Sequence, residues 1–191
     1  MGRNSMKVLG ASNLSNRDRV ENDFYSTDPI ALEGLLKEIP RLNSRIWECA
    51  CGQGHLSKVL EKYNYRVKST DLIDRGYGKG GIDFLKREKL WKGDILTNPP
   101  YIHAEEFIRK GLQLVPNGNK VIMFLKLLFL EGKKKKSLFA EFPPKVIYVS
   151  SSRIACSRNG IDTPGKGKAV AYAWFIWEKG FKGGTIVKWF N

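Results

Sequence analysis

Residues that bind metals or form disulfides are scarce in this chain. Its 191 residues include three cysteines, Cys49, Cys51 and Cys156, and two histidines, His55 and His103. The cysteines make neither a CxxC pair nor the framework typical of small secreted domains, and the histidines lie far apart in sequence. We therefore expect no metal site and no disulfide, and we expect the protein to be reduced and cytoplasmic.

Long hydrophobic stretches are also missing. The longest apolar run, VIMFLKLLFL at 121–130, is too short to cross a bilayer and contains Lys126, so we expect a core segment. The first residues show no apolar stretch followed by a cleavage site. No segment is a convincing basic amphipathic helix of the kind that lies on membranes. These absences argue against secretion and against a membrane-surface role.

Acidic residues are too few to balance the basic ones. The chain has 33 Lys and Arg against 19 Asp and Glu, a formal net charge of +14, which favours a polyanionic partner such as nucleic acid. The alternative is a solvated basic surface. A hydrophobic content of 42% suits one well-filled core. We expect a flexible basic arm at 1–22, which is polar and without periodicity, and a single domain at 23–191.

Strand-like and helix-like segments alternate along most of the chain. This alternation predicts an α/β fold with a mostly parallel sheet and helices on both faces. Two later strand-like segments, 145–150 and 170–177, leave no room for an ordinary helix between them, so we expect an antiparallel edge hairpin with a long basic loop. The other predicted elements are helices at 28–40, 55–63 and 104–114 and strands at 45–50, 65–70, 82–84, 94–97 and 121–125.

A glycine-containing turn separates the first predicted strand from the helix that follows it. Gly52 and Gly54 permit a tight turn and close approach of the backbone to a ligand, although the full GxGxxG pattern is absent. Asp71 ends the next strand, where a carboxylate can accept both hydroxyls of a ribose; a helix cap or a surface acid is the alternative. A further acid, Asp83, is placed beside Phe84 to meet an adenine amino group.

The segment TNPPY, residues 97–101, ends the predicted strand 94–97. Prolines lack an N–H donor and fix φ, so two of them must turn the chain rigidly. A rigid exit at the carboxyl end of a parallel strand is where open α/β sheets bind ligands. We therefore expect the Asn98 amide and the Tyr101 ring at the ligand edge, the alternatives being a plain turn and a core aromatic.

Together these features resemble the Rossmann-like S-adenosylmethionine-dependent methyltransferases, and among them the amino-group methyltransferases of DNA. ECACGQG at 48–54 resembles their first motif, EPACGxG, with Cys49 replacing proline, and NPPY at 98–101 is similar to their catalytic motif. DFYSTD at 23–28 resembles the segment that closes over the methionine end of the cofactor. The motif order resembles the gamma arrangement of adenine-N6 enzymes, and the size resembles small orphan enzymes of phages and prophages.

The resemblance covers about residues 23–125 and implies a class I methyltransferase with a seven-stranded sheet and S-adenosylmethionine as cofactor. It implies that NPPY is catalytic, through Asn98, Pro99, Pro100 and Tyr101. The cofactor-binding residues that we predict are Tyr25, Thr27, Glu48, Ala50, Cys51, Gly52, Gly54, Asp71, Leu72, Asp83, Phe84 and Asn98.

The chemistry of an amino group on a heteroaromatic ring explains the NPPY segment. Such a nitrogen is a poor nucleophile, because its lone pair is delocalised into the ring. Acceptance of its N–H bonds by the Asn98 side-chain oxygen and the Pro99 carbonyl would aim the lone pair at the methyl group. Tyr101 offers a ring on which a flipped base can stack. No strong base is needed, so we assign no such role to His55 or His103.

Two basic segments later in the chain are predicted to contact phosphates, the alternative being a solvated face. They contain Lys133, Lys134, Lys135, Lys136, Arg153, Arg158, Lys166 and Lys168. No segment is long enough for a separate target-recognition domain. Other hypotheses stay open: methylation of guanine or adenine in ribosomal RNA, methylation of glutamine in a protein, which the charge disfavours, and an inactive Rossmann-like subunit that binds nucleic acid.

Overall fold

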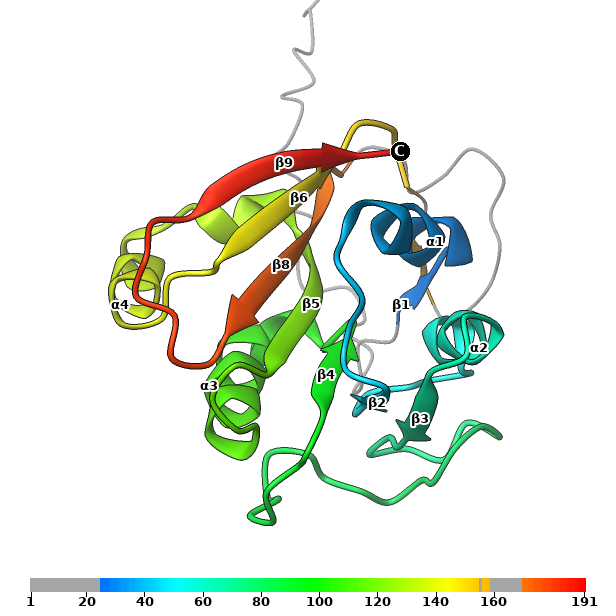
Figure 1. Cartoon of the computed structure of the whole chain (residues 1–191). Coiled ribbons are helices and arrows are strands. Elements are labelled where there is room, and N and C mark those ends of the chain that lie inside the picture. The colour runs from blue at the N-terminus through cyan, green and yellow to red at the C-terminus, as the bar shows by residue number, and fades with distance from the viewer. Residues whose placement is uncertain (1–24, 155, 159–169) are drawn as a thin grey trace, which may run out of the picture.

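The computed structural model describes residues 25–154, 156–158 and 170–191; the arm predicted at 1–22 lies outside them, as do Lys166 and Lys168. Seven strands form one sheet in the order β3-β2-β4-β5-β8-β6-β9 (Figure 1). β1 pairs with β7 in a small second sheet. In chain order the elements are β1 (Tyr25–Thr27), α1 (Pro29–Glu38), β2 (Arg45–Glu48), α2 (His55–Lys62), β3 (Arg66–Ser69), β4 (Asp94–Thr97), η1 (Tyr101–His103), α3 (Ala104–Leu114), β5 (Lys120–Lys126), η2 (Leu127–Leu130), α4 (Lys133–Glu141), β6 (Val146–Ser150), β7 (Cys156–Arg158), β8 (Tyr172–Glu178) and β9 (Ile186–Phe190).

Most predicted elements are present near their expected bounds. β4 and α3 have the predicted bounds, and β2, α2, β3 and β5 differ from theirs by one or two residues at an end. α1 begins as its sequence indicates, because the Asp28 side chain accepts a hydrogen bond of 3.0 Å from the Ile30 N–H and Pro29 occupies the first turn. The elements predicted from capping residues and periodicity are therefore present in the structure.

The strand predicted at 82–84 is wrong. The Asp83 side chain accepts the Leu85 N–H at 3.0 Å, and the Phe84 carbonyl accepts the Arg87 N–H at 3.1 Å. These local hydrogen bonds turn the backbone where a strand would extend it. Asp83 and Phe84 therefore lie on an irregular loop that follows β3.

The segment 121–130 is only partly a core segment. β5 is buried, but Leu128 and Leu130 in the 3-10 helix η2 are 62% and 43% exposed. The sequence also did not predict α4, whose first four residues are lysines, or β9, which is mostly exposed. Both elements are stabilised by packing and pairing with distant parts of the chain, α4 through buried Leu138 and β9 through its register with β6.

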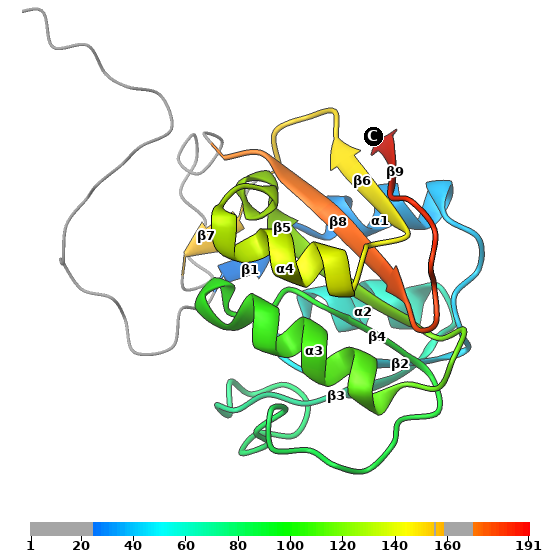
Figure 2. The same cartoon turned by 90° about the vertical axis from the view of Figure 1, so that its left-hand side faces the viewer.

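Helices cover both faces of the large sheet, as predicted (Figure 2). α1 and α2 pack on one face and α3 and α4 on the other. β5 serves both layers: Ile122 and Phe124 belong to the first, while Val121, Met123 and Leu125 belong to the second. This alternation follows from the period of two in a strand and explains why the segment is apolar throughout.

The antiparallel pairing predicted for the two late strands is confirmed. β6 and β8 pair antiparallel, with Val146 opposite Ile176, and β9 adds a parallel strand beyond β6. The segment after β6 then contributes β7, which pairs with β1 so that Thr27 lies opposite Cys156. This pairing carries part of the long basic loop to the segment that precedes α1, and it places the Arg158 backbone opposite Tyr25.

The strand order reverses beside β2. β2 lies between β3, the next strand in the chain, and β4, and all three are parallel. Their carboxyl ends therefore open at one edge, at the position where open α/β sheets bind ligands. Within the described ranges, no helix is long and apolar enough to cross a membrane.

Candidate active site

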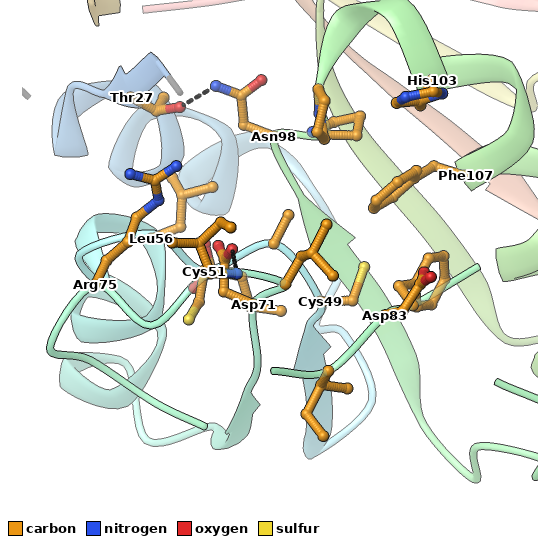
Figure 3. Close-up of a pocket in the computed structure, with 18 of the residues that line it drawn as sticks. Thr27, Cys49, Cys51, Leu56, Asp71, Arg75, Asp83, Asn98, His103 and Phe107 are labelled. Carbon is orange, nitrogen blue, oxygen red and sulfur yellow. Dashed lines mark hydrogen bonds between the residues drawn. The ribbon is translucent and has the colours of Figure 1, made fainter. Parts of the chain in front are cut away.

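A cavity of about 260 Å³ lies at the carboxyl ends of β2, β3 and β4 (Figure 3). Most residues predicted for the site line it: Thr27, Glu48, Ala50, Cys51, Asp71, Leu72, Asp83, Phe84, Asn98, Pro99 and Pro100. Residues that the sequence did not assign complete the lining: Ser26, Cys49, His55, Leu56, Ile73, Arg75, Ile82, Leu85, His103 and Phe107. The fold thus brings segments far apart in sequence to one cavity.

The glycine turn between β2 and α2 requires glycine at both predicted positions. Gly52 and Gly54 have φ values of 54° and 80°, which other residues rarely adopt. A Cβ atom on Gly54 would lie 2.3 Å from the Tyr77 ring, which packs against the turn. Because α2 starts at the next residue, its N-terminus lies beside the cavity.

Asp71 braces this turn from the end of β3. One carboxylate oxygen accepts the Gly52 N–H at 2.8 Å, and the other accepts the Ile73 N–H at 2.9 Å. A carboxylate oxygen can accept more than one hydrogen bond, so both oxygens keep accepting capacity toward the cavity. Asp71 is 9% exposed, and a ligand hydroxyl there would meet a carboxylate already fixed in orientation.

Glu48 lies deeper, at the end of β2, and is 2% exposed. Burial is the main cause that raises the pKa of this carboxyl to about 8, and the nearby Asp71 and Glu61 raise it as well. A hydrogen bond from the Ser57 hydroxyl acts in the opposite direction and lowers it. The Ser57 hydroxyl also lies 2.7 Å from that of Ser69. Glu48 thus holds its proton near neutral pH, and a cation in the cavity would favour the charged form.

The opposite wall is apolar, with a single acid. Phe84 packs edge-on to Trp47 at 5.3 Å between ring centroids and lies 4.9 Å from Phe107 of α3. The Asp83 side chain is 33% exposed and 3.5 Å from the Lys86 ammonium. A planar ring with one donor group fits such a wall, because its faces contact apolar atoms while the acid accepts from its edge.

Asn98 leaves β4 toward the cavity and is held by Thr27. Its side-chain nitrogen donates a 2.9 Å hydrogen bond to the Thr27 hydroxyl, and Figure 3 shows the amide oxygen turned away from that threonine. Thr27 is 3% exposed and belongs to β1, which is fixed by its pairing with β7. The neighbouring Pro99 is buried. The amide and the Pro99 carbonyl are therefore anchored at a rigid strand end.

Tyr101 lies beside the cavity and is not part of its lining. The ring is half-buried in η1, its centroid is 6.4 Å from that of Tyr172, and the Lys126 ammonium sits 4.7 Å from the centroid. A base stacked on Tyr101 would share this space with Lys126. The predicted stacking role stays a prediction.

The two histidines also line the cavity. Burial and the nearby Lys58 lower the pKa of His55, which lies at the start of α2. His103 is the N-cap residue of α3, with its Nδ1 3.5 Å from a carboxylate oxygen of Glu106. Neither residue is assigned a catalytic role. Among the described residues, no group of three or more His, Cys, Asp or Glu side chains could hold a metal ion.

The predicted phosphate-binding residues lie in different environments. Lys133, Lys136 and Arg153 are exposed, whereas Lys135 lies over the Phe129 ring and forms a 3.0 Å ion pair that lowers the pKa of Glu105. Of the other predicted cations, Lys134 has its backbone in α4 and Arg158 its backbone in β7, and Lys166 and Lys168 lie outside the described residues.

Comparison with known proteins identifies the fold. No protein-family model matches the chain, and no curated protein matches it. Among solved structures, an S-adenosylmethionine-dependent O-methyltransferase from Thermotoga maritima is 12% identical, with a TM-score of 0.53 over 80% of this chain and 65% of that one. A chain from Lactococcus lactis assigned as a hemolysin is 13% identical, with a TM-score of 0.57 over 82% and 89%.

A third similar structure is assigned as the modification subunit of a type I restriction enzyme from Vibrio vulnificus YJ016. It is 15% identical, with a TM-score of 0.53, and the match covers 87% of this chain and 46% of that subunit. At such identities the comparison shows a shared fold and not shared substrates or partners. The prediction from sequence is confirmed: the chain has the Rossmann-like fold of class I S-adenosylmethionine-dependent methyltransferases.

Proposed function

We propose that this chain is an S-adenosylmethionine-dependent methyltransferase that modifies the exocyclic amino group of a nucleic-acid base, adenine N6 in DNA. The observation that carries the proposal is the position of Asn98. Its amide lies at the end of β4, in the lining of a cavity that also includes Cys51 of the glycine turn after β2 and Asp71 at the end of β3. A donor of a methyl group and an acceptor amine would meet at that edge.

The lining suits the parts of the cofactor. Asp71 can accept the ribose hydroxyls, and Asp83, beside Phe84 and Phe107, can accept an adenine amino group. Buried Glu48 suits the cationic methionine end. Thr27 also lines the cavity and can contact that end. The cofactor, when bound, supplies a methyl group on a sulfonium centre. The dependence of the Thermotoga protein on S-adenosylmethionine supports the same assignment for this fold.

The strand end supplies what the amino group needs. The Asn98 oxygen and the Pro99 carbonyl would each accept one N–H bond of the base, which removes lone-pair delocalisation into the ring and directs the nitrogen toward the methyl group. Thr27 supports this role, because its hydroxyl accepts a hydrogen bond from the Asn98 amide nitrogen, and the amide oxygen points away from Thr27. The nitrogen becomes acidic once alkylated, so its proton can pass to water.

The charge of the molecule favours nucleic acid over a protein substrate. The net charge is +14, and Lys133, Lys136 and Arg153 are exposed. The carboxyl ends of β5 and β6, which precede these residues, face the same edge as Asn98, since both strands run antiparallel to β8. Cations at this edge would contact phosphates while a base enters the cavity.

The test is to identify the product. The protein is incubated with S-adenosylmethionine labelled in its methyl group and, in separate reactions, with duplex DNA, single-stranded DNA, ribosomal RNA or a release factor. We expect labelled N6-methyladenine from DNA. Label on a base of ribosomal RNA or on glutamine would overturn the DNA assignment, and cofactor binding without transfer to any substrate would indicate a non-enzymatic subunit.

A further inference from the structure

Two short 3-10 helices carry exposed apolar side chains at the edge of the sheet where the cavity opens. η1 follows β4 and η2 follows β5; these strands are parallel neighbours, with Thr97 opposite Met123. The two helices therefore leave the sheet at the same edge. Ile102 of η1 is 70% exposed, and Leu128 and Leu130 of η2 are 62% and 43% exposed. We call these three residues the apolar rim.

The rim is held in place by the core beneath it. In η2 the residues alternate, so that Leu127 and Phe129 pack against the core while Leu128 and Leu130 face outward. The Phe129 ring is fixed by Phe139 and Phe175, each 5.9 Å away between centroids. The exposed leucines are thus presented by an anchored turn. Single exposed apolar residues are ordinary, but several of them at the sheet edge that holds a ligand cavity indicate an interaction surface.

Cations flank η2 in the sequence and indicate the chemistry of the partner. Lys126 precedes η2, and α4 begins three residues after Leu130 with Lys133, followed by exposed Lys136. The first turn of α4 consists of lysines and has no acidic residue. Lysines are unfavourable there, because the N-terminus of a helix is its positive end. An anionic partner would offset that cost. The surface combines apolar side chains that can intercalate with charges that can meet phosphates.

Building on the proposed function, we propose that the apolar rim enters the base stack of a duplex and occupies the space left by the target base. A base inside a duplex cannot reach the end of β4, so it must rotate out of the helix. Apolar side chains inserted between base steps are a known means of holding such a distorted duplex. Leu128, the more exposed of the two leucines, is the central residue of this wedge. The preferred substrate is then duplex nucleic acid.

The experiment compares duplex and single-stranded DNA as methyl acceptors for Leu128→Ala and for the triple variant of the rim with alanine at all three positions. The matched control is Leu90→Ala. Leu90 is 65% exposed, and it lies in the segment that leads into β4, at the opposite end of the strand from Asn98. Circular dichroism and affinity for S-adenosylhomocysteine verify that each variant is folded. Fluorescence of 2-aminopurine at the target position reports base rotation.

The wedge predicts that the rim variants have kcat/KM on duplex DNA reduced about tenfold or more and give no 2-aminopurine signal, while single-stranded DNA is methylated as by wild type. A mismatch at the target base should restore part of the duplex rate, because less pairing must be broken. Leu90→Ala should behave as wild type on both substrates.

Unchanged duplex methylation in the triple variant would overturn the wedge, as would an equal reduction on single strands. Weaker binding of the rim variants to anionic lipid vesicles, without a duplex defect, would assign the surface to a membrane instead. A wild-type protein that methylates neither form of DNA would refute the proposed function itself, an outcome distinct from these.

Discussion

Among single residues, Thr27 links two parts of the candidate site that are far apart in the chain. Its hydroxyl accepts from the Asn98 amide nitrogen at 2.9 Å, and its strand is paired with β7. If the reacting amino group is bound by the amide oxygen, this hydrogen bond selects the productive orientation of the amide. Thr27 is then a positioning residue, in addition to any contact with the cofactor.

Thr27→Val should lower kcat about fivefold at saturating cofactor, because it removes an acceptor worth about 1 kcal/mol from the side chain that orients the base. Thr27→Ser, which keeps the hydroxyl, should recover most of the rate. Steady-state kinetics with duplex DNA measures both, and the affinity for S-adenosylhomocysteine is measured separately. Normal kcat in Thr27→Val would show that the amide is held by other groups.

Glu48 should make stability depend on pH. Its pKa is raised from 4.5 to about 8 in the folded protein, chiefly by burial. The folded state therefore binds more protons than the unfolded state in this range. The stability contribution is complete below the unfolded pKa and is lost as pH rises through about 8.

Urea unfolding of wild type and Glu48→Gln without cofactor tests this behaviour. Between about pH 5 and about pH 8, the free energy of unfolding of wild type should fall relative to the variant by on the order of a few kcal/mol. Glutamine cannot ionise and keeps a similar shape beside Ser57. Parallel curves for the two proteins would mean that burial does not disfavour the charged form of Glu48.

At the scale of elements, local signals explain which parts of the fold could be predicted. α1 has an N-cap aspartate and a first-turn proline, and β4 contains the apolar pair Ile95-Leu96 and is followed by Asn98 and two prolines. Such signals act over a few residues. β1 and β7 have only three residues each, and their pairing joins segments with no local sign of contact. The lysine-rich start of α4 likewise gives no local signal of a helix, which is stabilised by distant core residues.

The same distinction applies to the site. Asp71, the glycine turn and NPPY carry recognisable chemistry, so the sequence could single them out. Asp71, Cys51 of the turn and Asn98 to Pro100 line one cavity, and Tyr101 lies beside it. Phe107 and Ile73 have no such mark, because an apolar residue that lines a ligand site resembles one that fills a core. Arg75 could not be separated from the many other basic residues by sequence alone. Only the three-dimensional arrangement places these residues in the lining.

α4 provides an internal comparison for the role of its lysines. Lys133→Gln and Lys136→Gln should each reduce the slope of log affinity for duplex DNA against log salt concentration, by up to about 0.9 for each phosphate that is no longer neutralised. Lys135→Gln is the matched control, since its ammonium is already paired with Glu105 at 3.0 Å. Binding titrations with S-adenosylhomocysteine present measure the slopes. Equal slopes in all three variants and wild type would favour a solvated face.

At the scale of the whole molecule, topology and charge work together. The reversal of strand order beside β2 opens the cavity at one edge of the sheet, and the segments after β4, β5 and β6 extend from the same edge. The excess of positive charge, +14, would draw a polyanion to the molecule, and the exposed cations at this edge would orient it. In the proposed function, one sheet edge thus combines a cofactor cavity, a methyl-acceptor position and a surface for nucleic acid.

The most direct test of the proposed function separates cofactor binding from methyl transfer at Asn98. Asn98→Ala is compared with wild type and with Asn117→Ala, an exposed asparagine in the turn before β5, at the far edge of the sheet. Calorimetry measures the affinity for S-adenosylhomocysteine, and single-turnover assays measure transfer of labelled methyl groups to adenine in duplex DNA.

We predict that Asn98→Ala binds the cofactor product within about twofold of wild type, while transfer slows by about 100-fold or more, as expected when a preorganised acceptor worth about 2.7 to 4 kcal/mol is removed. Asn117→Ala should match wild type in both measurements. Near-normal methyl transfer by Asn98→Ala with intact cofactor binding would contradict the proposed function, because TNPPY would then be only a turn.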